Sequence, residues 1–355
     1  MTKTTPSRHN YIDVLRVVAS LMVIATHVMM HYITVFKVHS IPWTILMIGK
    51  VSTLTCVPVF FMISGATIYS STREETYGSF IKRRLSRVAI PFVVYAFLYY
   101  LFYVFVKHEF SFGILEFFKQ FFGKNIQGHL WYMYALVPLY FFYPMIKKLV
   151  HALSQKSLLT LIIAFFTIDS LIPLLNQIFA LFCDFDINIY SFGRMGVYLN
   201  YTLLGYYIHT YVPATKKNGF IAAISGGLSA IAIVALTYYT SVEKMDEQWI
   251  DILLAFVFIQ SIGVMLLAKC VHQNKTLKPF AQKMLSTLGA LSFSAYLVHM
   301  LILRTVQLNI SKDYMAKVPN DKAALLIAGI YIGAVILSYL WSFIVSKIPF
   351  IKKIL

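Results

Sequence analysis

Two ionisable side chains lie inside the first apolar stretch of the chain, and their spacing favours chemistry over anchoring. The stretch covers residues 11–35 and is long enough to cross a membrane as one helix. Arg16 and His27 are eleven residues apart, so a helix presents both on nearly the same face, about 16 Å apart along its axis. Titratable groups inside a span are costly and mark functional sites by default. The structural alternatives are snorkelling of Arg16 and a helix-to-helix hydrogen bond from His27.

Two further histidines stand beside aromatic residues in other predicted spans. His129 opens the stretch HLWYMYAL, and an aromatic belt at the membrane surface explains the neighbouring Trp131 and Tyr132. His299 ends the stretch SFSAYLVH, well inside a later span. A substrate site and ordinary structural hydrogen bonding both remain open for these residues. His31 follows His27 at a metal-ligand spacing, but no third ligand is evident, so we expect no metal site.

A cluster of arginines begins the third apolar stretch, in the sequence FIKRRLSRVAIPF. Arg84 and Arg87 are three residues apart and share a helix face, with Arg83 beside them. Guanidinium groups suit phosphate recognition. Anchoring at the cytoplasmic surface, or attraction to anionic lipid headgroups, is the alternative. Upstream, Ser64 lies in VPVFFMISG, where a kinked helix facing a cavity and a close helix crossing are both open.

The composition predicts an all-α, polytopic transmembrane helical bundle. The chain has 355 residues, of which 59% are hydrophobic and 13% charged, against about 25% charged in a soluble domain. The net charge of +17 lies mostly between apolar stretches, which argues against nucleic-acid binding. We expect one integral domain over residues 1–355. About ten spans are predicted, at 11–35, 45–70, 88–106, 129–148, 157–178, 193–212, 219–240, 249–269, 285–305 and 323–346.

Charge alternates along the loops and predicts the topology. Basic residues gather in every second loop and acidic residues in the loops between them, which indicates an even number of spans with both termini in the cytoplasm. Asp13 lies three residues before Arg16, so the two can touch, but capping of the helix that begins near Asn10 is the favoured role of Asp13. Asp169 and Arg194 are an intramembrane acid and its candidate partner, for which ion pairing is favoured over proton relay. Residues 112–122 are amphipathic and predict an interfacial helix.

Several of these stretches together resemble the acyltransferase 3 family of membrane proteins, over nearly the whole chain. In order, they are the Arg16…His27 pair, VPVFFMISG at 57–65, RLSR at 84–87, HLWYMYAL from His129, and SFSAYLVH ending at His299. The likeness is nearest to the branch that contains the enterobacterial common antigen O-acetyltransferase.

The resemblance implies a ten-helix enzyme of a bacterial inner or plasma membrane. It would take an acyl group, usually acetyl, from cytoplasmic acyl-CoA and pass it to a hydroxyl of a surface glycan or its lipid-linked precursor. Arg83, Arg84 and Arg87 would hold the donor's phosphates. His27 would be the general base, and Arg16 would be the second catalytic residue, at the same membrane level as these arginines. His129, Trp131, Tyr132, His299 and Ser64 are the predicted acceptor-side residues.

Two points limit the resemblance. Family members that modify peptidoglycan tend to carry a Trp-Ser-Leu…Glu pattern where this chain has Trp131-Tyr132-Met133, and no appended hydrolase-like domain is expected. A different envelope polysaccharide is therefore favoured as acceptor. Some relatives are thought to move polysaccharides or small molecules, so a transporter that uses the same cavity without His27 as a base is the alternative.

Overall fold

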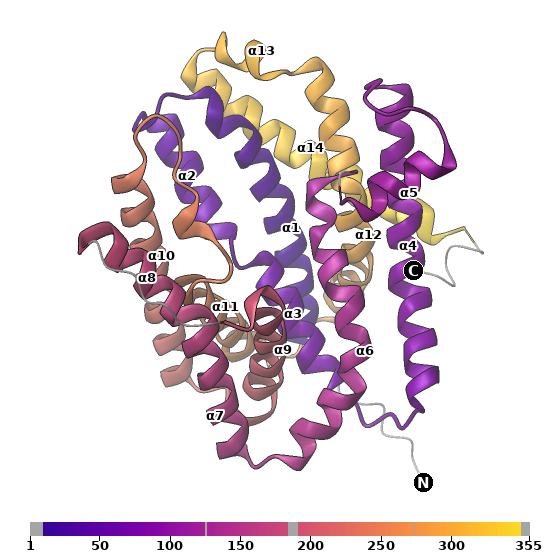
Figure 1. Ribbon diagram of the computed structural model, residues 1–355, viewed down its shortest axis with the longest axis vertical. Coiled ribbons are helices and arrows are strands. Elements are labelled where there is room, and N and C mark those ends of the chain that lie inside the picture. Colours follow the sequence, from indigo (N-terminus) through magenta and orange to yellow (C-terminus); the bar gives the residue numbers. More distant parts are fainter. Residues whose placement is uncertain (1–9, 125, 184–190, 274, 349–355) are drawn as a thin grey trace. The chain divides into compact units, whose positions relative to one another are not determined.

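The computed structural model describes residues 10–124, 126–183, 191–273 and 275–348, and every regular element in these ranges is a helix (Figure 1). The chain forms two compact units, each made of separate stretches of sequence. Unit 1 comprises the chain up to Met22, Val51–Ser70 and Gln155–Ala290. Unit 2 comprises Val23–Lys50, Ser71–Ser154 and the chain from Leu291 onward. The predicted all-helical fold is confirmed; the prediction of one integral domain stays a prediction.

Three helices run from one unit into the other along the chain, and the remaining elements belong to a single unit. The shared helices are α1 (Asn10–Tyr32), α2 (Ile41–Thr53) and α12 (Pro279–Asn309). Unit 1 contains α3 (Cys56–Ile68), α7 (Gln155–Phe166), the π-helical turn η3 (Thr167–Leu171), α8 (Ile172–Phe182), α9 (Gly193–Tyr211), α10 (Lys216–Thr240), η4 (Gln248–Ile250) and α11 (Ala255–His272). Unit 2 contains η1 (Ile33–Val35), α4 (Tyr77–Phe105), α5 (Ile114–Phe122), η2 (Gly128–Leu130), α6 (Trp131–Ala152), α13 (Lys312–Ala316) and α14 (Asn320–Ser346).

Helices occupy all ten predicted spans, and eight helical segments of the described chain are long and apolar enough to cross a membrane. They are 10–35, 41–68, 77–105, 155–182, 216–240, 248–272, 279–309 and 320–346. The two other predicted spans correspond to α6 and α9, which are rich in tyrosine and carry Lys147, Lys148 and Arg194. Most residues of α9 are buried against other parts of the protein rather than facing lipid, so this helix does not need an apolar surface on every side.

In unit 1, α3 and α9 lie side by side (Figure 1), and they cross at a close contact between two glycines. A Cβ atom on Gly65 would lie 1.8 Å from the carbonyl oxygen of Thr202, and one on Gly205 would lie 2.1 Å from that of Met62. The hydroxyls of Tyr69 and Thr202 are hydrogen-bonded at 3.0 Å beside this contact. Of the two interpretations of the Ser64–Gly65 stretch, the structure therefore has the close helix crossing.

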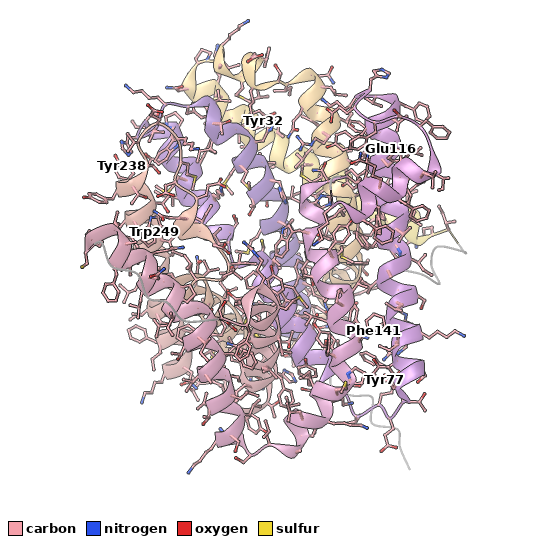
Figure 2. All side chains as sticks on the ribbon, in the orientation of Figure 1. Tyr32, Tyr77, Glu116, Phe141, Tyr238 and Trp249 are labelled. Carbon is pink, nitrogen blue, oxygen red and sulfur yellow. The ribbon has the colours of Figure 1, made fainter. Side chains whose placement is uncertain are left out.

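In unit 2, α4 packs against α6 and α5. The Tyr77 hydroxyl donates to the carbonyl of Phe141 at 2.9 Å, which ties the start of α4 to α6; Figure 2 labels both residues. The Tyr100 hydroxyl contacts the carbonyls of Ser111 and Gly113 at 2.7 and 2.9 Å, just before α5. α5 buries Phe117 and exposes most of its other large apolar side chains, as the amphipathic pattern of residues 112–122 predicts.

The predicted pairing of Asp169 with Arg194 is wrong. One Asp169 carboxylate oxygen accepts the backbone amide of Phe192 at 2.7 Å, and Arg194 lies 3.4 Å from Asp251 instead. The physical reason is that the π-helical turn places Asp169 directly against the backbone at the start of α9, where a Cβ on Gly196 would lie 2.4 Å from its other oxygen. The carboxylate is therefore partnered by backbone, and the arginine finds an acid near η4.

We expect Gly65→Ala to destabilise the protein by about 1–3 kcal/mol or more, because the added methyl group meets backbone that has no room to move. The thermal unfolding midpoint of the purified protein in detergent measures this. Gly227→Ala in α10 is the matched control, since a Cβ there has nothing within 4 Å and alanine is the better helix former. Equal midpoints for the two variants would contradict the crossing.

Candidate functional site

Three imidazole rings meet in unit 2, from three different elements. His27 comes from α1, His129 from η2 and His299 from α12. The ring centroids of His27 and His299 are 5.2 Å apart, those of His129 and His299 4.9 Å, and those of His27 and His129 6.1 Å. His299 is fully buried, His129 is 3% exposed and His27 is half-buried. We call these three residues the histidine cluster.

The hydrogen bond of His299 determines which of its ring nitrogens carries a proton. Nδ1 of His299 lies 2.6 Å from the carbonyl oxygen of Tyr296, and a carbonyl only accepts, so Nδ1 is the donor. In the neutral ring, Nε2 then carries a lone pair, and this buried atom has no hydrogen-bond partner within the described chain. Tyr296 also donates its hydroxyl to the carbonyl of His129 at 2.7 Å. One tyrosine therefore contacts two members of the histidine cluster.

A second tyrosine, Tyr99 of α4, contacts the backbone of α12 around His299. Its hydroxyl donates to the carbonyl of Leu297 at 2.8 Å and accepts the amide of Leu301 at 3.0 Å. These are the two backbone groups that a regular α-helix joins to each other across one turn. The Tyr99 ring also lies 5.2 Å from that of His129. Tyr99 is thus bound to the turn that carries His299.

The predicted acceptor-side residues divide into three groups. Tyr132 is 5% exposed and its ring stands 5.7 Å from that of Tyr296, so it extends the aromatic wall beside His129. Trp131 is 37% exposed. Ser64 belongs to unit 1, where its hydroxyl donates to the carbonyl of Phe60 at 3.0 Å. The structure therefore brings together His27, His129, His299 and Tyr132.

Positive charge surrounds the histidine cluster. Arg304 and Lys50 are near enough to His27 for their charges to act on it, and Lys50 is only 2% exposed. Arg304 donates to Gln307 at 3.0 Å, while its buried Nε has no hydrogen-bond partner among the residues described. Such cations stabilise negative charge that develops in a site of low dielectric constant. No group of three or more His, Cys, Asp or Glu in the described ranges is arranged to hold a metal ion.

Sequence reasoning missed Tyr99, Lys50 and Arg304. Lys50 carried a usable signal, because a lysine inside an apolar span marks a functional site just as His27 does. Arg304 follows His299 by five residues in the same span and carried a similar signal. Tyr99 belongs to a run of tyrosines and phenylalanines that offers no pattern to distinguish it.

The arginine motif occupies the first turns of α4, and its three members differ in environment. Arg83 forms a two-point ion pair with Glu75, with Nε to Oε2 at 3.1 Å and a second short contact from Nη2 to Oε1. Arg84 is half-buried, with its guanidinium 5.6 Å from the Phe80 ring and 5.9 Å from the Tyr140 ring. Arg87 is exposed. Glu75 thus engages Arg83, while Arg84 is held by aromatic rings and Arg87 faces outward.

Arg16 stands in unit 1, on the part of α1 that precedes His27. It donates to Asp13 at 3.0 Å, a contact that the three-residue spacing allows, and its side chain is 34% exposed. Because α1 is one continuous helix from residue 10 to residue 32, Arg16 and His27 are about 16 Å apart along its axis.

The fold and the site define an all-helical, multi-pass membrane protein with a buried histidine cluster. Comparison with family models adds the identity of its class: the acyltransferase 3 model, an acyltransferase domain, matches residues 9–347. The chain therefore belongs to the acyltransferase 3 family and is a membrane acyltransferase. No curated protein and no solved structure matches it.

The ion pair of Glu75 predicts a pH-dependent contribution to stability. The hydrogen bond from Arg83 lowers the pKa of Glu75, so the pair stabilises the folded protein above the usual pKa of a glutamate and is lost as pH falls through the lowered value. We expect Glu75→Gln to cost about 1 kcal/mol or less at pH 7 and less than that at pH 3, measured by thermal unfolding. Glu74→Gln, at an exposed neighbour, is the control. A loss that is the same at both pH values would contradict this account.

Proposed function

We propose that this protein is a membrane O-acyltransferase that moves an acyl group, most simply acetyl, from cytoplasmic acyl-CoA to a hydroxyl of a cell-surface polysaccharide or its lipid-linked precursor. The observation that supports this is the histidine cluster, whose three imidazole rings lie 4.9–6.1 Å apart with Arg304 and Lys50 near His27. Proton transfer from a hydroxyl needs such a base near neutral pH. Family membership favours an enzyme over the transporter alternative.

The donor side of the proposal rests on α4. Arg84 and Arg87, with Arg83, would bind the phosphates of acyl-CoA at one end of this helix. Tyr99, which contacts His129, lies fifteen residues after Arg84 on the same helix, or about 22 Å along its axis. Arg84 and Tyr99 project within about 60° of each other. The pantetheine arm would follow this face and carry the thioester to the histidine cluster.

In the proposed chemistry, His27 is the general base. It takes the proton of the acceptor hydroxyl as that oxygen bonds to the thioester carbonyl carbon. The carbon–sulfur bond then breaks, and the CoA thiolate leaves and recovers the proton, so atoms and charge balance. Arg304 and Lys50 would stabilise the oxyanion formed between these steps. Arg16, on the part of α1 that precedes His27, stays a predicted catalytic residue.

The path of the acceptor would be lined by His129, Tyr132, Trp131 and His299. Ser64 is the remaining residue predicted on the acceptor side. The acceptor arrives as a glycan or lipid-linked glycan in a membrane, which we expect to be a bacterial inner or plasma membrane. The enterobacterial common antigen branch stays a prediction, as does an acceptor other than peptidoglycan.

His27→Ala should abolish acyl-CoA turnover while leaving donor binding intact. We expect at least a 100-fold loss in the rate of acetyl-CoA thioester cleavage, because a positioned general base contributes about 10²–10⁴-fold. The assay uses purified protein in detergent, with binding of acetyl-CoA measured by calorimetry. The control is His31→Ala, one turn further along α1, where the imidazole packs against Tyr32. Turnover by the His27 variant at the wild-type rate would reject the proposed base.

Loss of Arg84 or Arg87 should weaken donor binding without slowing the chemical step. We expect Arg84→Ala and Arg87→Ala each to raise the KM for acetyl-CoA about 10-fold at low salt, with kcat nearly unchanged, because a phosphate contact is made equally in the ground and transition states. The salt dependence of KM should also fall. Lys82→Ala, at an exposed cation two residues before Arg84, is the matched control. The same KM change in all three variants would show that these arginines act only through general surface charge and would reject specific phosphate binding.

A further inference from the structure

The hydrogen bonds around His299 form an arrangement that the proposed chemistry does not yet use. The carbonyl of Tyr296 accepts a hydrogen bond from Nδ1 of His299, and the hydroxyl of Tyr296 donates one to the carbonyl of His129. This leaves the Nε2 lone pair of His299 bare and buried, with no partner in the ranges described. An unpartnered polar nitrogen costs free energy in a buried site, and both ring nitrogens of His129 are in the same condition.

The cluster can hold only one extra proton at a time. Two protonated rings whose centroids are 4.9–6.1 Å apart would repel each other strongly in a buried site, and Arg304 and Lys50 add to that repulsion. When His27 is protonated, its neighbours must therefore be neutral. The ring of His299 lies closer to His27 than the ring of His129 does. The hydrogen bond from Nδ1 of His299 to the Tyr296 carbonyl also leaves the lone pair of the neutral ring on Nε2.

We propose that His299 is the second proton-accepting group of acyl transfer, taking up at Nε2 the proton that His27 removes from the acceptor, and that Tyr99 is the residue that positions it. The inference rests on the proposed acyltransferase function. During the step, the acceptor O–H bond breaks and its proton passes to His27 and then, through one bridging water, to His299 while the C–O bond forms. When the C–S bond breaks, the proton returns through His27 to the CoA thiolate. No oxidant or other reactant is needed.

Tyr99 positions His299 through the backbone. Its hydroxyl stands between the Leu297 carbonyl and the Leu301 amide, and His299 lies midway between these residues. These two hydrogen bonds anchor the turn of α12 that carries His299 to α4. Without the hydroxyl, the turn loses this anchor, and the imidazole of His299 is held less firmly in its present orientation.

The first test removes the Nε2 base and keeps the backbone bond. Asparagine carries an amide nitrogen near the place of histidine Nδ1, so His299→Asn can still donate to the Tyr296 carbonyl but has no group at the position of Nε2. We expect kcat for acetyl-CoA cleavage to fall about 100-fold with KM unchanged. Full activity in this variant would overturn the proposal.

The second test compares Tyr99→Phe with Tyr95→Phe. Tyr95 lies one turn earlier on α4, and its hydroxyl contacts the side chains of Ser294 and Trp341 at 3.0 Å, with no backbone of α12 involved. We expect about a 10-fold loss of kcat, with unchanged KM, for Tyr99→Phe and little change for Tyr95→Phe. Equal losses in the two variants would overturn the positioning role.

A spectroscopic measurement separates positioning from loss of fold. In protein labelled with ¹⁵N-histidine, the signals of His299 are assigned by their disappearance in His299→Asn. We expect a protonated Nδ1 and a bare Nε2 in the wild type and in Tyr95→Phe, and a mixture of tautomers in Tyr99→Phe. A fixed wild-type tautomer in Tyr99→Phe would overturn the positioning role.

Because this signal needs no substrate, it is independent of the donor assay. A wild-type protein that cleaves no acetyl-CoA would overturn both the proposed function and the role of His299. An active His299→Asn variant would overturn the role of His299 alone.

Discussion

Backbone polar groups of membrane-spanning helices must find partners inside the protein, and in unit 2 tyrosine hydroxyls provide several of them. Tyr99 bonds to α12 at Leu297 and Leu301, and Tyr296 bonds to the carbonyl of His129. These bonds hold the backbone from which His129 and His299 project. The imidazoles themselves make few hydrogen bonds, so their positions depend on the hydroxyls around them. The chain has 24 tyrosines among its 355 residues. Their rings pack between the helices, and the hydroxyls of Tyr99 and Tyr296 form hydrogen bonds with backbone groups.

Because the backbone around His299 is held by a tyrosine of α4, this helix has two functions. Its first turns carry the arginine motif, and Tyr99, four turns later, contacts both the histidine cluster and the turn that bears His299. A rigid helix keeps the distance between these two features constant, which suits a substrate whose charged end and reactive end are separated by a thin arm. The pair of Arg83 with Glu75 and the bond from Tyr77 to Phe141 hold the first part of this helix in place.

Much of this architecture could be predicted from the sequence, because apolar stretches of membrane length leave few alternatives to a helical bundle. The sequence also singled out His27, His129 and His299, each from a different span. Their proximity could not be predicted, since it arises from packing between segments more than a hundred residues apart. Tyr99 was missed because nothing in a run of aromatics shows which hydroxyl meets a neighbouring backbone. The partners of Arg194 and Asp169 were mistaken for the same reason: the π-helical turn that directs Asp169 to the backbone of α9 has no signature in the sequence.

The glycine crossing of α3 and α9 has a consequence for motion. Helices that slide past each other do so through layers of side chains that exchange one packing for another. At Gly65 and Gly205 no such layer exists, because each backbone rests directly on the other. The two helices therefore move as a single body, and conformational change within unit 1 falls to contacts that are made through side chains. Different states of this protein should superpose on α3 and α9, which makes that pair the natural frame of reference for measuring any movement in unit 1.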